Sequence, residues 1–421
     1  MSEKKNKLHF AWLVLVGICL MVGLGKGAMN NSAGLFLAPV AKDLGVGMGN
    51  LTLYFSVSAI VTMIFLPISG KLMAKYDTRY ILSIAIILQG GAFALFGVMS
   101  SVWGWYILAI PLAVGGVFIT VIAGPVLINT WFKKHNGLAL GIMGAATGLI
   151  GAFSQPIVGN LISNQGWRQS YMMVGIVAIV IAVPIIFLFL RKSPQEKGLL
   201  PLGMSEPTSN EGGSANTSEN SGISFAVAKK SAAFFSLITF FFIITSFGSF
   251  AIHMPTYLMH KGYDVTFAGN IMSAYMVGSL IGSLVFGIFS DKIGAKNTTL
   301  FAMVIGIISV TLLLFFANSA MIITIAVALF GFVAASIGTL SPAITSALFG
   351  SKEYSQIYST VSMGLAVASI IALPAYGYVY DLAGSYTPAL YALIVLLIIN
   401  IVCILIAFNS KEKMVKAGLW K

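Results

Sequence analysis

Lys26 is the most unusual charged residue of this sequence, because it lies in a long apolar stretch that contains no other charge between His9 and Lys42. A cation in the middle of such a stretch costs about 2.5–3.5 kcal/mol on membrane-insertion scales. It should therefore face a polar space. Asn30 follows one helical turn later on the same face, and Asn31 is adjacent. The three side chains form a polar stripe suited to an anionic group, and the alternative is a structural lysine bonded to backbone carbonyls.

Three further polar residues lie in apolar stretches and are candidate binding residues. His253 could titrate near neutral pH or donate a hydrogen bond, or it could be a packed core histidine. Tyr257 follows it by one turn. Gln155 precedes Pro156, so its amide could bind a ligand or satisfy backbone groups that the proline frees. Tyrosines 358, 376 and 380 could line a cavity, although aromatic residues at this spacing are also typical of a core.

The sequence offers no pattern for catalysis or for a cofactor. No acidic residue lies deep in an apolar stretch, and no Gly-x-x-x-x-Gly-Lys-Ser/Thr phosphate loop occurs. Paired carboxylates, a nucleophile with its base and metal-ligand spacings are also missing. Cys19 and Cys403 both lie in apolar stretches, which indicates neither a disulfide nor a metal site. We therefore expect no enzyme activity, no cofactor and no metal.

The composition predicts that most of the chain is surrounded by lipid. Of 421 residues, 58% are hydrophobic and 9% are charged, whereas about a quarter of the residues of a soluble domain are charged. Apolar stretches long enough to span about 30 Å of hydrocarbon recur throughout. They predict an all-α membrane protein of twelve transmembrane helices, at roughly 10–40, 50–73, 79–100, 104–131, 137–163, 168–190, 231–259, 265–290, 298–317, 320–349, 354–381 and 386–408.

The positive charges identify the side of the membrane. The net charge is +12, and nearly all Lys and Arg residues fall in loops on one side of the predicted helices. Only Lys42, Arg168 and Lys261 fall on the other side. Because positive loops stay in the cytoplasm, we expect a multi-pass protein of the inner cell membrane with both termini cytoplasmic. The basic excess then needs no nucleic-acid partner.

The chain divides into two halves that repeat. Residues 191–230 are polar, and 205–222 are almost entirely Ser, Asn, Gly, Glu and Thr, which predicts a flexible cytoplasmic linker. It separates a six-helix half at 1–190 from a second at 231–421. Two markers recur at nearly the same offset, namely the segments 70–79 and 287–296 and the Pro-x-x-Gly segments 156–159 and 374–377. Duplicated halves are typical of transporters whose site lies between the repeats.

Two sets of motifs resemble known families. Gly287-x-Phe-x-Asp291-Lys292-x-Gly294-x-Lys296 resembles the cytoplasmic loop signature of the major facilitator superfamily. The first-half copy departs from it, because Ala74 replaces the usual Asp. The segment Trp131-Phe-Lys-Lys-His-Asn-Gly-Leu-Ala-Leu-Gly141 and the segments 348–354 and 380–386 resemble the monocarboxylate and oxalate/formate porter branch.

This resemblance implies two pseudo-symmetric six-helix halves that move a solute by alternating access. It assigns gating to Asp291, Lys292 and, in the first-half copy, Arg79. An Asp at the end of a helix can accept hydrogen bonds from a neighbouring helix N-terminus and hold one face of the bundle closed. The alternative is that Asp291 is an ordinary solvated loop charge.

We expect the solute to be a small organic anion, in particular a monocarboxylate. The branch usually has an arginine at the position of Ser283, and here the eighth helix has no basic residue and the eleventh no lysine. A dicarboxylate needs two cationic anchors, so a monoanion should be preferred.

The alternatives are a carrier or exporter of a neutral or amphipathic, drug-like solute and, third, a membrane enzyme or receptor. The expected partners are the solute, the lipid bilayer and protons as a candidate coupling ion, with the protein a monomer.

Overall fold

The computed structural model describes residues 9–132, 135–203, 222–350 and 352–420, and these residues form an all-helical protein. Two isolated bridges, Phe132 with Leu202 and Gly222 with Gly350, are the extended pairings within this part of the chain. Of the predicted flexible linker at 191–230, residues 204–221 lie outside the described residues. The predicted fold class is confirmed.

Contacts divide the chain into two compact units, residues 1–33 with 57–213 and residues 34–56 with 214–421. The second unit therefore contains a segment of the first predicted half, Gly34–Ser56, which the boundaries at 190 and 231 do not anticipate. This segment contains the helical residues 34–44 and 48–56. The contacts of residues 48–56 are described below.

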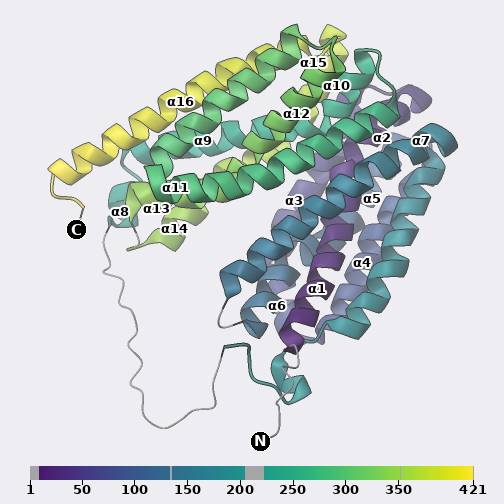
Figure 1. Ribbon diagram of the computed structural model, residues 1–421, viewed down its shortest axis with the longest axis horizontal. Helices are drawn as coiled ribbons and strands as arrows, with labels where there is room; N and C mark the ends of the chain where they lie inside the picture. Colours follow the sequence, from purple (N-terminus) through teal and green to yellow (C-terminus); the bar gives the residue numbers. More distant parts are fainter. Residues whose placement is uncertain (1–8, 133–134, 204–221, 351, 421) are drawn as a thin grey trace, which may run out of the picture. The chain divides into compact units, whose positions relative to one another are not determined.

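The first unit contains helices from the N-terminal part of the chain (Figure 1). Two of them, α2 and α3, extend into the second unit. Helix α1 packs along α7, and α4 packs between α5 and α7. The elements are α1 (Phe10–Val22), η1 (Gly23–Asn30), α2 (Asn31–Leu44), α3 (Met48–Lys75), α4 (Thr78–Leu95), η2 (Phe96–Val98), α5 (Val102–Gly116), η3 (Val117–Ile122), α6 (Ala123–Trp131), α7 (Asn136–Phe189) and η4 (Pro194–Lys197).

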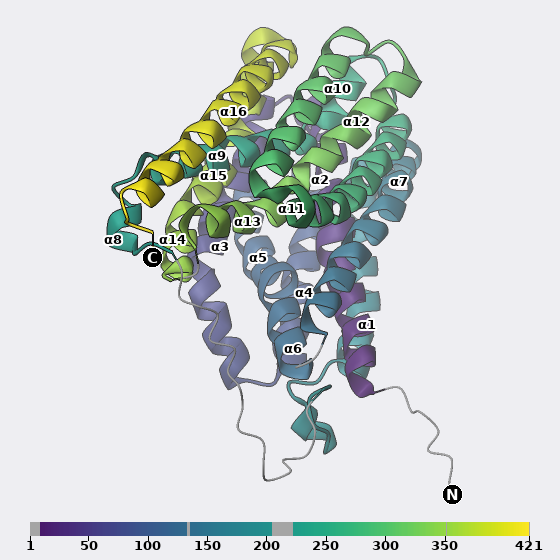
Figure 2. The ribbon, with the colours of Figure 1, turned by 60° about the vertical axis from the view of Figure 1, so that its left-hand side comes forward.

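The second unit contains the C-terminal helices. Helices α9, α15 and α16 run side by side, and α11 packs along α12 (Figures 1 and 2). The elements are α8 (Phe225–Ala228), α9 (Ala232–Ser249), η5 (Phe250–Ile252), α10 (Met254–His260), α11 (Val265–Phe315), α12 (Ala320–Ala334), α13 (Ser336–Phe349), α14 (Tyr354–Val361), α15 (Met363–Ala383) and α16 (Thr387–Lys416).

Ten helices in the described residues are long and apolar enough to cross a membrane. Two of these, Leu138–Phe189 and Val265–Phe315, are too long for one crossing. Each is broken at a glycine with a positive φ, Gly166 (φ 77°) and Gly294 (φ 81°). A side chain would strain the backbone there. Counting each as two gives the twelve predicted segments.

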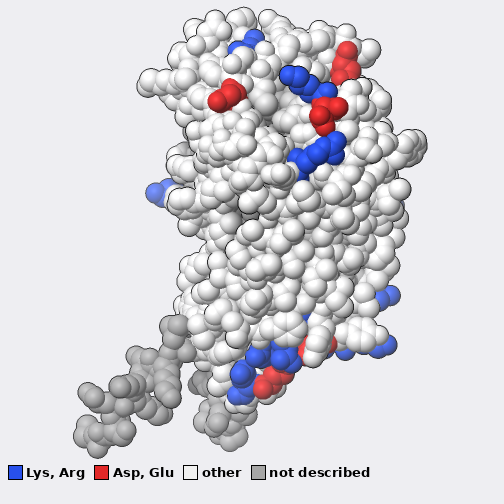
Figure 3. Space-filling model, turned by 90° about the vertical axis from the view of Figure 1, so that its right-hand side faces the viewer, with Lys and Arg blue, Asp and Glu red and all other residues white. Residues whose placement is uncertain are grey.

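The surface agrees with a membrane environment. On the face shown in Figure 3, Lys, Arg, Asp and Glu gather in a few patches, and a wide surface almost free of them lies between. Many large apolar side chains are exposed, including Phe153, Leu188 and Met321. Water would disfavour such a surface, whereas lipid does not.

Candidate functional site

Lys26 and Asn30 lie on a π-helical stretch, η1, which interrupts the first transmembrane segment. Its backbone bonds reach one residue further than in an α-helix, as the N–H of Asn31 donates to the carbonyl of Lys26. The side chains of Lys26 and Asn30 are exposed, and Gly23, Gly25, Gly27, Ala28 and Met29 are buried. Two members of the predicted stripe, Lys26 and Asn30, are therefore open on this element, and the third, Asn31, follows it. Short π-helical segments occur frequently at functional sites.

Glycines fix η1 against its neighbours. A Cβ at Gly27 would lie 2.7 Å from the carbonyl oxygen of Thr147 and 3.0 Å from the backbone nitrogen of Gly151. A Cβ at Gly25 would lie 2.6 Å from a methyl group of Ile119. Since the distances of 2.7 Å and 2.6 Å are shorter than real Cβ contacts, glycine is required for η1 to approach α7 and the second π-helix, η3, this closely.

Gln89 of α4 is a site residue that the sequence analysis missed. Its side chain is fully buried, and its Nε2 donates to the carbonyl of Gly25 at 3.1 Å and to Oδ1 of Asn30 at 3.2 Å. Gln89 thus connects α4 to the backbone of η1 and to one member of the polar stripe. The signal that could have found it is an amide within an otherwise apolar run, directly before Gly90 and Gly91.

Lys26 makes no hydrogen bond or ion pair with any residue that the structure describes. The structural alternative was that facing carbonyls accept hydrogen bonds from the Lys26 ammonium group. The described residues make no such bond. A cation with an exposed side chain and no carboxylate beside it is available to an anion. A binding role for Lys26 stays a prediction.

Gln155 lies on α7 one turn beyond Gly151, beside η1. It is fully buried, and neither amide atom has a hydrogen-bond partner among the described residues. It therefore does not satisfy backbone freed by Pro156. Its neighbour Ser154 donates to the carbonyl of Gly27 at 3.4 Å, which places this turn of α7 against η1. Asn31, half-buried, starts α2.

His253 and Tyr257 are packed inside the second unit. Nδ1 of His253 lies 2.7 Å from the hydroxyl of Tyr386, and Nε2 lies 2.9 Å from the carbonyl of Leu373. The carbonyl can only accept, so Nε2 carries the proton and Nδ1 accepts from the tyrosine. Tyr257 donates to the carbonyl of Leu313 at 2.5 Å. These bonds occupy both ring nitrogens of His253 and the hydroxyl of Tyr257, as expected for the packing alternative that was given for His253.

The three tyrosines of the eleventh predicted helix are likewise in contact with protein groups. Tyr376 is buried and donates to the carbonyl of Ser246 at 2.9 Å. The hydroxyl of Tyr380 lies 3.4 Å from Nδ1 of His260, and the ring of Tyr358 packs edge-on against Phe241. Tyr376 is therefore a core residue, whereas Tyr358 and Tyr380 are half-buried.

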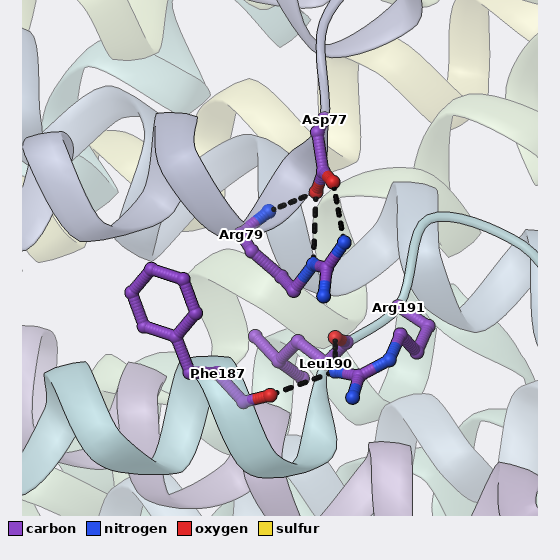
Figure 4. Close-up of polar contacts among 5 residues, drawn as sticks. All are labelled: Asp77, Arg79, Phe187, Leu190 and Arg191. Carbon is purple, nitrogen blue, oxygen red and sulfur yellow. Dashed lines mark hydrogen bonds and ion pairs between the residues drawn. The ribbon is translucent and has the colours of Figure 1, made fainter.

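The predicted gating residues have different surroundings. Asp291 and Lys292 are exposed and make no bond within the described part of the chain. Arg79 pairs with Asp77 at 2.7 Å, and Asp77 also accepts from the Arg79 backbone N–H at 2.9 Å, so this carboxylate caps α4 (Figure 4). The hydrogen bond from Arg79 lowers the pKa of Asp77. At neutral pH the cap is therefore ionised.

Asp381 makes the kind of contact that we predicted for the gating residue Asp291, since it accepts hydrogen bonds from the N-terminus of another helix. Its two oxygens accept from the backbone N–H groups of Met48 (2.8 Å) and Gly49 (2.7 Å), at the N-terminus of α3. Both partners belong to the second unit. A carboxylate is favourable there because the first N–H groups of a helix lack partners and carry partial positive charge.

Further contacts continue this junction between α3 and α15. A Cβ at Gly377 would lie 2.7 Å from Cα of Gly49, so the two backbones cross at glycines. Two turns later, the hydroxyl of Ser56 donates to the carbonyl of Ile370 at 2.5 Å. We call these contacts, from Asp381 to Ser56, the α3–α15 junction.

Replacing Asp381 by Asn should lower the free energy of unfolding by about 1–2 kcal/mol, because a neutral amide caps the helix less strongly and only one of its two atoms can accept. Thermal unfolding of the purified protein measures this. Glu412→Gln is the control, since this exposed carboxylate has no hydrogen bond or ion pair among the described residues. Its effect should stay within about 0.5 kcal/mol. Equal effects of the two variants would show that the Asp381 contacts do not contribute to the free energy of unfolding.

Comparison with known proteins identifies the family. The model of the Major Facilitator Superfamily matches residues 15–270 and 236–419. The chain belongs to this superfamily. It is therefore a multi-pass membrane protein and a secondary transporter, and it is not an enzyme.

Similar proteins agree with this assignment. A hexuronate transporter of Bacillus subtilis is 25% identical over 64% of this chain and 62% of its own length. A glucose-6-phosphate exchanger of Mus musculus, SLC37A2, is 27% identical over 56% of this chain and 53% of its own length. The chain thus spans less than two thirds of either relative. A bacterial homologue of the lysosomal transporter Spinster has the same fold, with a TM-score of 0.70 at 15% identity, covering 98% of this chain and 99% of that one.

Proposed function

We propose that this transporter moves a small organic anion with one carboxylate by alternating access. The observation that carries the proposal is Lys26, an exposed cation on a π-helical segment of a transmembrane helix, with no acidic partner among the described residues. A cation is costly inside a membrane. Binding an anion supplies the counter-charge that the protein itself does not provide.

Both relatives support an anionic substrate, and the hexuronate transporter alone supports a substrate with a single carboxylate. Glucose 6-phosphate carries an anionic phosphate, and a hexuronate carries a single carboxylate. Asn30 adds a polar group on the same face as Lys26, so that one oxyanion can contact both. Among the described side chains of η1, this face offers one cation, which suits one negative charge better than two.

Alternating access requires contacts that close one side to break when the other side closes. In our proposal the α3–α15 junction belongs to the side opposite the cytoplasm, and Asp291 and Lys292 belong to the cytoplasmic side. The bias of Lys and Arg toward one set of loops supports this orientation, with both termini in the cytoplasm. The carrier then works as a uniporter, an exchanger or a proton-coupled symporter.

A monocarboxylate should bind about tenfold more tightly than its dicarboxylate analogue, because the second carboxylate would lose water without meeting a second cation. Glucuronate against glucarate, and butyrate against succinate, form suitable pairs. Binding to the purified protein and uptake into proteoliposomes, both at about pH 7.5, measure the preference.

Two other outcomes would contradict the proposal. Tighter binding of glucarate or succinate would show that a second cationic anchor exists and would overturn the monocarboxylate preference. If none of the four acids binds, and neutral or amphipathic solutes are transported instead, the anion proposal fails. Lys26 would then be a structural residue.

A further inference from the structure

We propose that Gln89 is a positioning residue that turns the Asn30 amide so that its N–H₂ group, together with the Lys26 ammonium, faces an oxyanion of the substrate. This inference rests on the proposed anion transport. It assigns a role to a residue of α4 that lies behind the polar stripe and is itself fully buried.

The backbone fixes the orientation of Gln89. The carbonyl of Gly25 can only accept a hydrogen bond, and it lies 3.1 Å from Nε2 of Gln89. The opposite orientation would bring two acceptor oxygens together. Since an amide NH₂ has two hydrogens, the second hydrogen of Nε2 is left to donate to the Asn30 side chain, 3.2 Å away.

The orientation of Gln89 in turn fixes that of Asn30. The atom of Asn30 that faces Nε2 must be an acceptor, so it is Oδ1. Its Nδ2 group then points away from Gln89. Asn30 is exposed, as is Lys26 four positions before it on η1. One π-helical turn spans slightly more than four residues, so the two side chains leave η1 in similar directions.

The resulting face presents donors from both residues. An ammonium group and an amide N–H₂ both donate, and neither accepts in this arrangement. Such a pair recognises a deprotonated carboxylate or a phosphate oxygen, and it discriminates against groups that must donate, such as a protonated acid. The recognised chemistry is therefore an oxyanion, and free carboxylates and phosphate esters are its two sources.

Stability alone does not explain a glutamine at this position. The Oε1 atom of Gln89 is buried and has no hydrogen-bond partner among the described residues. An unpaired buried acceptor is unfavourable, and an apolar side chain of similar length would avoid it. Gln89→Met should therefore leave the protein folded, which permits a test of the positioning role.

The test is a double-mutant cycle on the full-length purified protein, with glucuronate and glucose 6-phosphate as probes. Gln89→Met should weaken binding of the preferred probe about tenfold, and Asn30→Ala should do the same. If Gln89 acts through Asn30, the double variant should lose about tenfold and not a hundredfold. A merely structural change at Gln89 would give additive losses.

The control is Asn400→Leu, which removes a buried amide of α16 that donates to the carbonyl of Phe240 and has an unpaired Oδ1. It should leave probe binding unchanged. Additive losses, or unchanged binding in Gln89→Met, would overturn the positioning role, while binding of glucuronate by the wild type would still support the proposed function. If the wild type binds neither these probes nor butyrate, glucarate or succinate, the proposed function and this inference both fail. The preferred probe distinguishes carboxylate from phosphate.

Discussion

Lys26→Ala should reduce uptake of the transported anion by about 100-fold or more. The variant removes the one basic side chain that η1 contains, and a hydrogen bond to a charged group contributes about 1.5–3 kcal/mol in total. Uptake of labelled glucuronate into proteoliposomes measures the change. Thermal stability should be unchanged or higher, because an unpaired cation in a transmembrane segment is itself unfavourable.

Two further variants show whether the charge is responsible. Lys26→Arg keeps the charge but changes the shape of the donor, and it should retain part of the uptake. Lys42→Ala is the matched control, since this exposed lysine lies in the last turn of α2, outside the polar stripe. Full uptake in Lys26→Ala would contradict the binding role, and loss of folding in this variant would favour a structural lysine.

Gly27→Ala should impair both stability and transport. The added Cβ would meet backbone atoms of Thr147 and Gly151, which cannot move as a flexible side chain can. Overpacking of this kind costs about 1–3 kcal/mol. Because η1 carries Lys26 and Asn30, its displacement from α7 should lower uptake by tenfold or more. Thermal unfolding and glucuronate uptake measure the two effects.

Gly91→Ala is the control for this substitution. Gly91 also lies in a transmembrane helix, but a Cβ there meets no atom within 4 Å. Alanine has the higher helix propensity, so this variant should be as stable as the wild type or slightly more stable. If Gly27→Ala behaves in the same way, the close approach of η1 to α7 is not required for transport.

The sequence determined the helical membrane architecture, because the property that specifies it is local. Each transmembrane segment has to be apolar over its own length, whatever surrounds it. The twelve segments follow from this requirement, including the two breaks that the structure places at Gly166 and Gly294. The same reasoning indicated Lys26, since a charge in a lipid-spanning segment is exceptional regardless of its neighbours.

The partners of the polar residues could be decided only by the tertiary structure. His253 and Gln155 are both polar residues in apolar helices. The sequence alone gives no reason to prefer either of them as a binding residue. In the structure both ring nitrogens of His253 are bonded, whereas the amide of Gln155 has no partner among the described residues. The difference depends on Tyr386 and Leu373, which lie far from His253 in the sequence.

Gln89 and Asp381 show the same dependence on the fold. Gln89 contacts Gly25 and Asn30 only because glycines let η1 approach α4 and η3 closely. Asp381 caps α3 from a helix more than three hundred residues away in the chain. Composition and periodicity describe which face of a helix avoids water, but a hydrogen bond requires two groups at about 3 Å, and the packing of separate helices alone sets that distance.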